Sequence, residues 1–225
     1  MTAAVSVIIP TRNEEPWIAG AVASAFHAGA AEVIVADAGS TDRTTALAAE
    51  EGARVLPCPG PRARQLNEAA KVASNEALIF LHADTQLPGG AAAAVAEALA
   101  AGEVAFGGFR IAFLEPDRRL LTVASMINFR TRMTRCPWGD QAQFIRREIF
   151  LQMGGFREIP LMEDYDLALR MKRQGRTVIL PQVVSTSGRR FLNKGVLRTA
   201  AINWSIIIQF RLGADPEKLA EWYRR

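Results

Sequence analysis

Cysteine is scarce in this sequence, which holds only Cys58 and Cys136 among 225 residues. A chain of this length buries roughly 70% of the surface that its unfolded form exposes, so it can be stable without disulfides. We therefore expect both cysteines to be reduced. No run reaches the ~18 consecutive apolar residues that indicate a membrane span. Residues 1–9 also lack the basic start and cleavage site of a signal peptide. These absences predict one globular, cytoplasmic protein.

Several nucleotide-binding and nucleic-acid-binding motifs are missing as well. No GxGxxG follows the first apolar run, which argues against an NAD-dependent Rossmann enzyme, and no GxxxxGK[ST] exists, which excludes a P-loop ATPase. The basic residues accompany neither an aromatic stacking motif nor a zinc-finger spacing, so we expect no nucleic-acid partner.

Positive charge is scarce in the first half and abundant in the second. Residues 1–105 carry 6 basic against 12 acidic residues, and residues 106–225 carry 21 basic against 11 acidic residues. The second half therefore faces an anionic partner, such as the phosphates of a nucleotide, of a lipid carrier or of a membrane surface.

Short apolar runs alternate with helix-like segments in the first hundred residues. Strands are predicted at 5–10, 32–36, 55–56 and 77–81, and helices at 14–27, 62–74 and 88–101. A further helix is predicted to begin at Asp42 or Thr44 and to end near Gly52. This alternation indicates an α/β fold with a mainly parallel sheet flanked by helices. Because ligands of such sheets bind beyond the carboxyl ends of the strands, the loops beginning at Thr11, Asp37, Cys58 and His82 are candidate binding loops.

The second half is less regular. Strands are predicted at 104–113, 143–145 and 177–180, and helices at 118–134, 148–153 and 164–174. Gly107 and Gly108 predict a bulge or a close approach within the first of these strands. The uncharged segment 199–210 follows several basic residues and is too short to span a bilayer. It fits an interfacial helix, but its apolar residues surround most of the helix, which favours packing on the core or against a second subunit.

The loop Asp37-Ala38-Gly39-Ser40-Thr41-Asp42 follows a predicted strand and precedes a helix. Ser40, Thr41 or Asp42 is sufficient to cap that helix, which leaves Asp37 without a structural assignment. A carboxylate at the end of a strand can accept hydrogen bonds from a ribose hydroxyl or a nucleobase. Asp37 is therefore a candidate nucleotide ligand.

An apolar strand delivers His82 and Asp84 into the loop that follows it. Side chains two residues apart on an extended segment share a face, and such a pair can hold Mg²⁺ or Mn²⁺ through the Asp oxygen. Taken alone, the pair is better explained by an Asp that caps the next helix and a His bonded to the backbone.

Three carboxylates, Glu163, Asp164 and Asp166, stand at the start of a predicted helix. Acidic residues there interact favourably with the helix dipole, which is a purely structural role. Successive helical residues point about 100° apart, so Glu163 and Asp164 do not both face one substrate. One of them fits a general base, and the other caps the helix or pairs with an Arg.

These motifs, in this order, resemble the signature of family 2 glycosyltransferases over residues 4–187: segment 5–15, then 37–42, then 80–84, then Glu163-Asp164. The resemblance implies a GT-A fold, a nucleotide-sugar donor, a divalent metal (Mn²⁺ or Mg²⁺) and an inverting mechanism. Residues 59–67 and the Trp138-Gly139-Asp140-Gln141 loop also resemble a compact subgroup, the selenodomain-associated and arsenosugar-biosynthesis glycosyltransferases.

The resemblance also implies roles for individual residues. Asp84 matches the metal-binding acid of the DxD motif. Asp164 matches the catalytic base, and Glu163 beside it is assigned to the catalytic residues as well. Trp138 and Asp140 are assigned to acceptor binding. The residues implied in nucleotide binding are Thr11, Glu14, Asp37, Arg64, Asn67 and His82.

Two departures from the family pattern keep other functions open. Ala38 stands where many relatives carry a second Asp, and His82 replaces the first acid of DxD, where a neutral imidazole still offers a hydrogen bond. The chain could therefore be a catalytically weakened binding or scaffold subunit. A sugar nucleotidyltransferase is the other alternative. The QxxRW motif of processive synthases is missing and Arg189-Arg190-Phe191 is a weak counterpart, which favours transfer of a single sugar.

The expected organisation is a GT-A domain at residues 1–187, with a nucleotide-binding half at 1–105 and an acceptor-binding half at 106–187. Residues 188–225 form a basic and apolar helical extension. The expected partners are a UDP- or GDP-sugar and a small-molecule or lipid-linked acceptor. The extension also predicts either a homodimer or peripheral contact with the inner face of the membrane.

Overall fold

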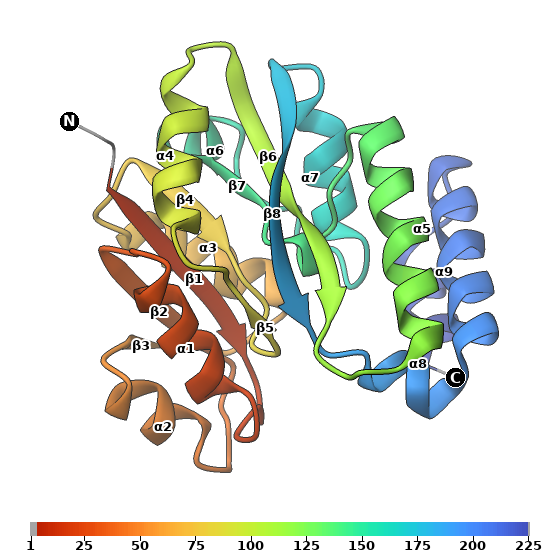
Figure 1. Ribbon diagram of the computed structural model, residues 1–225, viewed down its shortest axis with the longest axis horizontal. Coiled ribbons are helices and arrows are strands. Elements are labelled where there is room, and N and C mark those ends of the chain that lie inside the picture. Colours follow the sequence, from red (N-terminus) through yellow and green to blue (C-terminus); the bar gives the residue numbers. More distant parts are fainter. Residues whose placement is uncertain (1–3, 225) are drawn as a thin grey trace.

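The computed structural model describes residues 4–224, and within them eight strands form one sheet (Figure 1). The spatial order is β3-β2-β1-β4-β7-β6-β8-β5. Strands β1 to β4 run parallel, β7 is antiparallel to both of its neighbours, β6 and β8 are parallel, and β5 is antiparallel to β8. The predicted α/β fold with a mixed, mainly parallel sheet is confirmed. The strands are β1 (Val5–Thr11), β2 (Glu32–Asp37), β3 (Arg54–Pro57), β4 (Ala77–Phe80), β5 (Thr85–Gln86), β6 (Val104–Phe113), β7 (Phe144–Arg146) and β8 (Arg176–Thr186).

Helices cover both faces of the sheet, and two hydrophobic clusters fill the layers between them. The first cluster joins α1 (Ile18–His27), α2 (Thr44–Glu50) and α4 (Ala91–Ala100) to one face. The second joins α3 (Arg62–Val72), α6 (Arg147–Gln152) and α7 (Glu163–Met171) to the other face. Strand β1 is buried along its whole length, as expected for a parallel strand covered on both sides.

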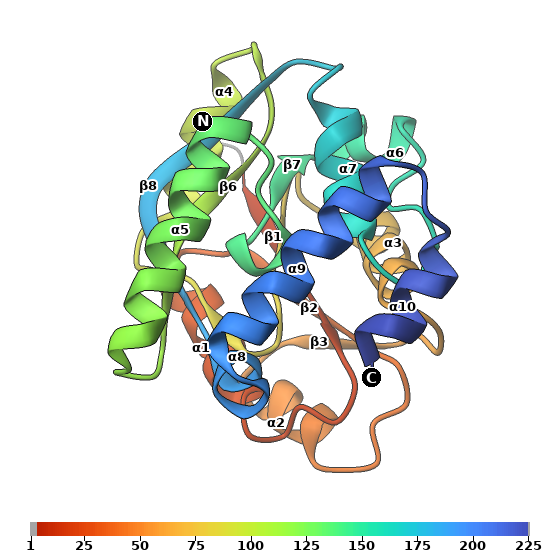
Figure 2. The same cartoon turned by 90° about the vertical axis from the view of Figure 1, so that its right-hand side faces the viewer.

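The remaining helices lie along one side of the molecule, which faces the viewer in Figure 2. They are α5 (Arg118–Thr134), α8 (Arg189–Lys194), α9 (Val196–Arg211) and α10 (Pro216–Arg224). Helices α5 and α9 start close together near α8 and diverge from there (Figure 2). Ile206 and Ile207 of α9 pack into the second cluster. Among the helices of residues 4–224, none is both long and apolar enough to cross a membrane.

Three differences between the predicted and the observed elements are larger than the shifts of one to three residues found at other boundaries. Helix α1 begins at Ile18 rather than at Glu14, since residues 15–17 form a turn in which the N–H groups of Trp17 and Ile18 both donate to the Glu14 carbonyl. Strand β8 continues to Thr186, since a register shift between β6 and β8 accommodates Pro181, which made the sequence look interrupted. Strand β5 has only two residues, too few for a periodic pattern.

Gly107 and Gly108 provide the predicted close approach. A Cβ atom at Gly107 would lie 2.2 Å from the ring of Phe144, and one at Gly108 would lie 2.5 Å from Pro137. The Phe144 ring of the paired strand β7 can therefore lie against Gly107, and the loop before β7 can pack on Gly108. That contact holds the loop with Trp138 and Asp140 against the sheet.

Candidate active site

A cavity of about 590 Å³ lies beyond the carboxyl ends of β1, β4 and β8, where α5 and α9 close over it. This is the edge of the sheet that the strand order predicts for ligand binding. The cavity brings together seven of the eleven predicted site residues, from four separate stretches of the chain: Thr11, Glu14, His82, Asp84, Trp138, Asp140 and Asp164.

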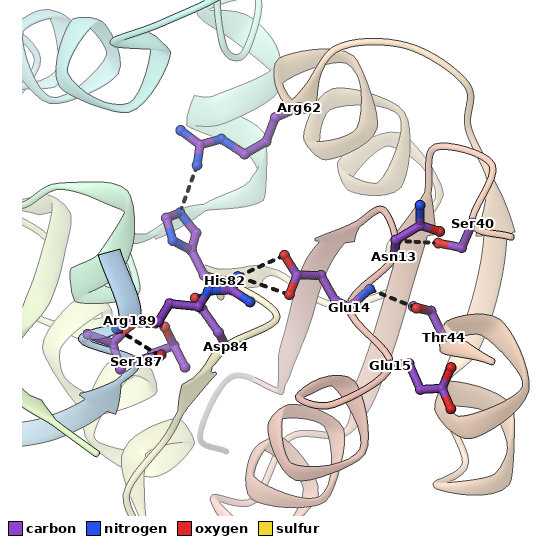
Figure 3. A network of polar contacts seen from close by, with 12 residues as sticks. Asn13, Glu14, Glu15, Ser40, Thr44, Arg62, His82, Asp84, Ser187 and Arg189 are labelled. Carbon is purple, nitrogen blue, oxygen red and sulfur yellow. Dashed lines mark hydrogen bonds and ion pairs between the residues drawn. The ribbon is translucent and has the colours of Figure 1, made fainter. Parts of the chain in front are cut away.

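Asp84 faces a cation supplied by the C-terminal segment. The Nη2 atom of Arg189 lies 3.1 Å from an Asp84 carboxylate oxygen and 3.0 Å from both carboxylate oxygens of Glu14 (Figure 3). Burial raises the pKa of Asp84, Arg189 opposes that rise, and Glu14 adds to it. Arg189 thus links β1, β4 and the C-terminal helices in one charged cluster.

His82 is neutral in this site. Burial and the neighbouring Arg62 guanidinium lower the pKa of His82 to about 3, although Asp164 opposes the shift. The Nε2 atom lies 3.3 Å from Nη1 of Arg62 (Figure 3), so Nε2 accepts and the ring proton resides on Nδ1. The structure therefore agrees with a histidine that offers hydrogen bonds rather than charge.

Asp164 is held by the loop that contains Trp138 and Asp140. The backbone N–H of Gly139 donates to Oδ2 of Asp164 at 2.6 Å, and Asp164 stands in the first turn of α7. Helix N-termini favour a negative charge. A Cβ atom at Gly139 would lie 2.6 Å from Nε2 of His82 and 3.0 Å from Oδ2 of Asp164. Only glycine fits there without displacing two site residues.

Glu163 points away from the cavity. It is buried, and its Oε1 accepts a hydrogen bond from Nε of Arg62 at 2.5 Å. The residue before it, Met162, adopts a left-handed conformation with φ 69°, which costs energy for a residue with a side chain. This turn directs Glu163 to Arg62 and Asp164 into the cavity, so the two carboxylates do not face the same space, as the helical spacing predicts.

One corner of the cavity holds unpaired polar atoms. Within residues 4–224, Nε of Arg130, Nε1 of Trp138 and Oδ1 of Asp140 are buried without a hydrogen-bond partner. The guanidinium of Arg130 stacks 3.8 Å from the centre of the Trp138 ring. Burial raises the pKa of Asp140 to about 6, although Arg130 opposes the shift. Buried polar atoms usually find partners, so this corner is suited to a polar group of a ligand.

Four predicted site residues lie outside the cavity lining: Asp37, Arg64, Asn67 and Glu163. Asp37 accepts hydrogen bonds from Thr11 and from the backbone of Gly39 and Ser40, so it stabilises its own loop. Arg64 pairs with Glu158 at 3.0 Å on the surface. Asn67 exchanges two hydrogen bonds with the backbone of Phe156.

Four residues that shape the site are not among the predicted site residues: Arg62, Arg130, Gly139 and Arg189. Arg62 and Arg189 carried a signal, because each stands in the first turn of a helix, where the dipole disfavours a positive charge. An arginine at the start of a helix therefore indicates that its charge is balanced by an acidic group outside that helix. Gly139 and Arg130 had no such signal, because their roles depend on contacts with distant residues.

Comparison with known families identifies the chain. A model of the family described as glycosyl transferase family 2 matches residues 6–157, which is more than half of the chain. The chain therefore belongs to glycosyl transferase family 2, as its motifs predict. A search of curated proteins finds no match to it.

Solved structures share the fold. A crystal structure of S. aureus TarS, residues 1–349, has a TM-score of 0.64 and 19% identity, over 82% of this chain and 60% of that chain. The mannosyltransferase PcManGT from Pyrobaculum calidifontis, in complex with GDP-Man and Mn²⁺, has a TM-score of 0.59 and 19% identity. The match covers 83% of this chain and 57% of the mannosyltransferase chain. M. tuberculosis glucosyl-3-phosphoglycerate synthase has a TM-score of 0.58 and 21% identity. The match covers 83% of this chain and 72% of the synthase chain. The chain thus spans about three fifths of the TarS fragment and of the mannosyltransferase. The likeness concerns the fold.

Proposed function

We propose that this protein is an inverting glycosyltransferase that moves one sugar from a UDP- or GDP-sugar to a hydroxyl acceptor. The observation that carries the proposal is one cavity, in a family 2 domain, that is lined both by Asp164 and by the Asp84–Arg189–Glu14 cluster. A general base and a charged cluster for a diphosphate are the two elements that such a transfer requires.

Asp164 is the proposed general base. It takes the proton of the acceptor hydroxyl while that oxygen attacks the anomeric carbon from the side opposite the leaving diphosphate, which inverts the configuration. The Gly139 N–H holds one carboxylate oxygen, so the carboxylate is oriented before the substrates bind. Glu163 has no part in the proton transfer, because it is buried against Arg62, and it acts by positioning.

The donor diphosphate is proposed to bind at Asp84, Glu14 and Arg189. Among the described residues, no group of three His, Cys, Asp or Glu side chains could hold a metal ion alone. Mg²⁺ and Mn²⁺ sites of nucleotide enzymes often use one or two carboxylates and complete the shell with substrate phosphates. Asp84 fits that arrangement, and a divalent ion bound there would neutralise charge on the leaving diphosphate. Arg189 supplies a fixed positive charge at the same place.

The relatives support the donor class. The TarS fragment was also crystallised in complex with UDP, and PcManGT in complex with GDP-Man and Mn²⁺. The acceptor is proposed to bind near Arg130, Trp138 and Asp140, because their buried atoms are unpaired. Membership of the selenodomain-associated and arsenosugar subgroup, the division at residue 187 and a cytoplasmic location stay predictions.

A donor turnover assay tests the proposal. Purified protein is mixed with UDP- or GDP-linked hexoses and Mn²⁺, and the released nucleoside diphosphate is measured. We expect slow release from one donor class without acceptor, because water can replace the acceptor hydroxyl beside Asp164. Asp84→Asn should abolish this release. A folded protein that binds the nucleotide but releases none from any donor would support the scaffold alternative instead.

A further inference from the structure

The outer surface of α5 and α9 is apolar where a helix surface normally is polar. Eight of the thirteen large hydrophobic side chains that are exposed in the described residues lie on these two helices or at their ends. On α9, Leu197, Trp204, Ile208 and Leu212 are 47–86% exposed. On α5, the corresponding residues are Leu121, Met126, Phe129 and Met133. We call these eight residues the α5–α9 face.

The four α9 residues form a continuous stripe. They follow one another at intervals of seven, four and four residues, a spacing that keeps them on one side of a helix. The opposite side of α9 is also apolar, because Ile206 and Ile207 pack on the core. The helix therefore has two apolar sides, and only one of them is covered within the molecule. Exposed apolar patches of this kind mark interaction sites.

Positive charge surrounds this face. Residues 118–135 contain five arginines and no acidic residue, and residues 188–214 contain five basic residues and no acidic residue. Arg119 is paired with Asp117. The other exposed cations of these segments form no salt bridge with any residue in 4–224: Arg118, Arg132, Arg135, Lys194, Arg198 and Arg211. Much of the charge excess of the second half of the chain is therefore gathered here.

We propose that the α5–α9 face binds the surface of an anionic lipid bilayer. Apolar side chains with an exposed tryptophan can enter the boundary between headgroups and acyl chains, while the surrounding arginines and lysine contact anionic headgroups. A second copy of the chain fits this face less well. A two-fold symmetric contact would place one set of cations against another with no carboxylate in these segments between them.

The cavity opens onto this face. Met126 and Trp204 belong to the exposed face and also line the cavity, together with Val123, Ile127, Ala200 and Ile207 of the same two helices. Docking would thus place the cavity mouth at the headgroups. If the proposed transferase function holds, the acceptor is a lipid whose headgroup hydroxyl reaches Asp164 along an apolar wall.

Vesicle flotation tests the docking without any donor or turnover. Vesicles of equal parts phosphatidylglycerol and phosphatidylcholine are compared with vesicles of phosphatidylcholine alone. We expect binding to the anionic vesicles, weakened by salt. Each basic residue near an anionic surface strengthens binding roughly fivefold. Lys194→Gln with Arg198→Gln should therefore weaken it by about 30-fold, and Trp204→Ser with Ile208→Ser by at least about tenfold.

The matched control is Arg43→Gln with Arg54→Gln, which removes two exposed cations from the α2 and β3 region, and it should bind like the wild type. The proposal is overturned if the wild type does not float with anionic vesicles, or if the two α9 variants bind as tightly as the control. It is also overturned if light scattering shows a dimer that the Trp204→Ser, Ile208→Ser variant dissociates while vesicle binding is unchanged. Because these assays measure vesicle binding and oligomeric state without donor or turnover, their results do not depend on whether the protein is a transferase.

Discussion

Asp164→Asn will reduce sugar transfer at saturating donor by roughly 10²–10⁴-fold, the range that a positioned general base contributes. Asparagine keeps nearly the same shape and retains a carbonyl oxygen that can accept from the Gly139 N–H, as Oδ2 of Asp164 does. It has no basic oxygen for the acceptor proton. The loss should appear in kcat, while the affinity for the nucleotide stays close to that of the wild type, because Asp164 bonds to the backbone of Gly139 and Tyr165 and not to Asp84 or Arg189.

Asp117→Asn is the matched control for this variant. Asp117 also accepts a backbone N–H at the start of a helix, but it does not line the cavity. It should therefore transfer sugar at the wild-type rate. Near-wild-type transfer by Asp164→Asn would show that Asp164 is not the base.

Gly139→Ala will lower kcat by about 100-fold, because a displacement of about 1 Å in a site can cost that much. The added methyl group would meet Nε2 of His82 at 2.6 Å and Oδ2 of Asp164 at 3.0 Å. Both side chains have to move, and the hydrogen bond from the Gly139 N–H to Asp164 is disturbed. A kinetic comparison of the purified variant with the wild type, at saturating donor, measures the effect.

Gly89→Ala provides the comparison. Its added methyl group would meet His27 at 3.5 Å, an ordinary van der Waals contact, and Gly89 is remote from the cavity lining. We expect wild-type kcat for this variant and a similar melting temperature for all three proteins. If Gly139→Ala retained the wild-type kcat, the placement of the loop against His82 and Asp164 would be wrong.

Much of the fold follows from local patterns in the sequence. The buried run at β1 and the helix signals around α3 and α5 gave the correct elements because apolar periodicity and local capping determine them. The length of β8 could not be predicted, because Pro181 ends a strand by local rules and only the partner strand β6 shows the register shift that accommodates it.

Site residues could be predicted where the place of a residue in the chain and its residue type both point to the site. Asp84 and Asp164 follow a strand and begin a helix, respectively, so their placement at the cavity could be inferred from chain order. Arg189 could not be found in this way, because it lies 175 residues after Glu14 and reaches the site only through the packing of α8. Asp37 lies at the end of a strand, as predicted, but its carboxylate accepts hydrogen bonds from the backbone N–H groups of Gly39 and Ser40 in its own loop. Local sequence patterns do not show this hydrogen bonding.

The central claim is that the cavity binds a nucleoside diphosphate at Asp84 and Arg189. The most direct test is the melting temperature of the protein with UDP, GDP, dTDP, CDP and ADP, each with and without Mn²⁺. A ligand at a hundred times its Kd stabilises the folded state by about 2.7 kcal/mol, and a chain of this size gains about 2–4 °C per kcal/mol. We predict a Mn²⁺-dependent increase of several degrees with UDP or GDP that Asp84→Asn removes. Cooperative melting at an unchanged temperature with all five nucleotides would contradict the account.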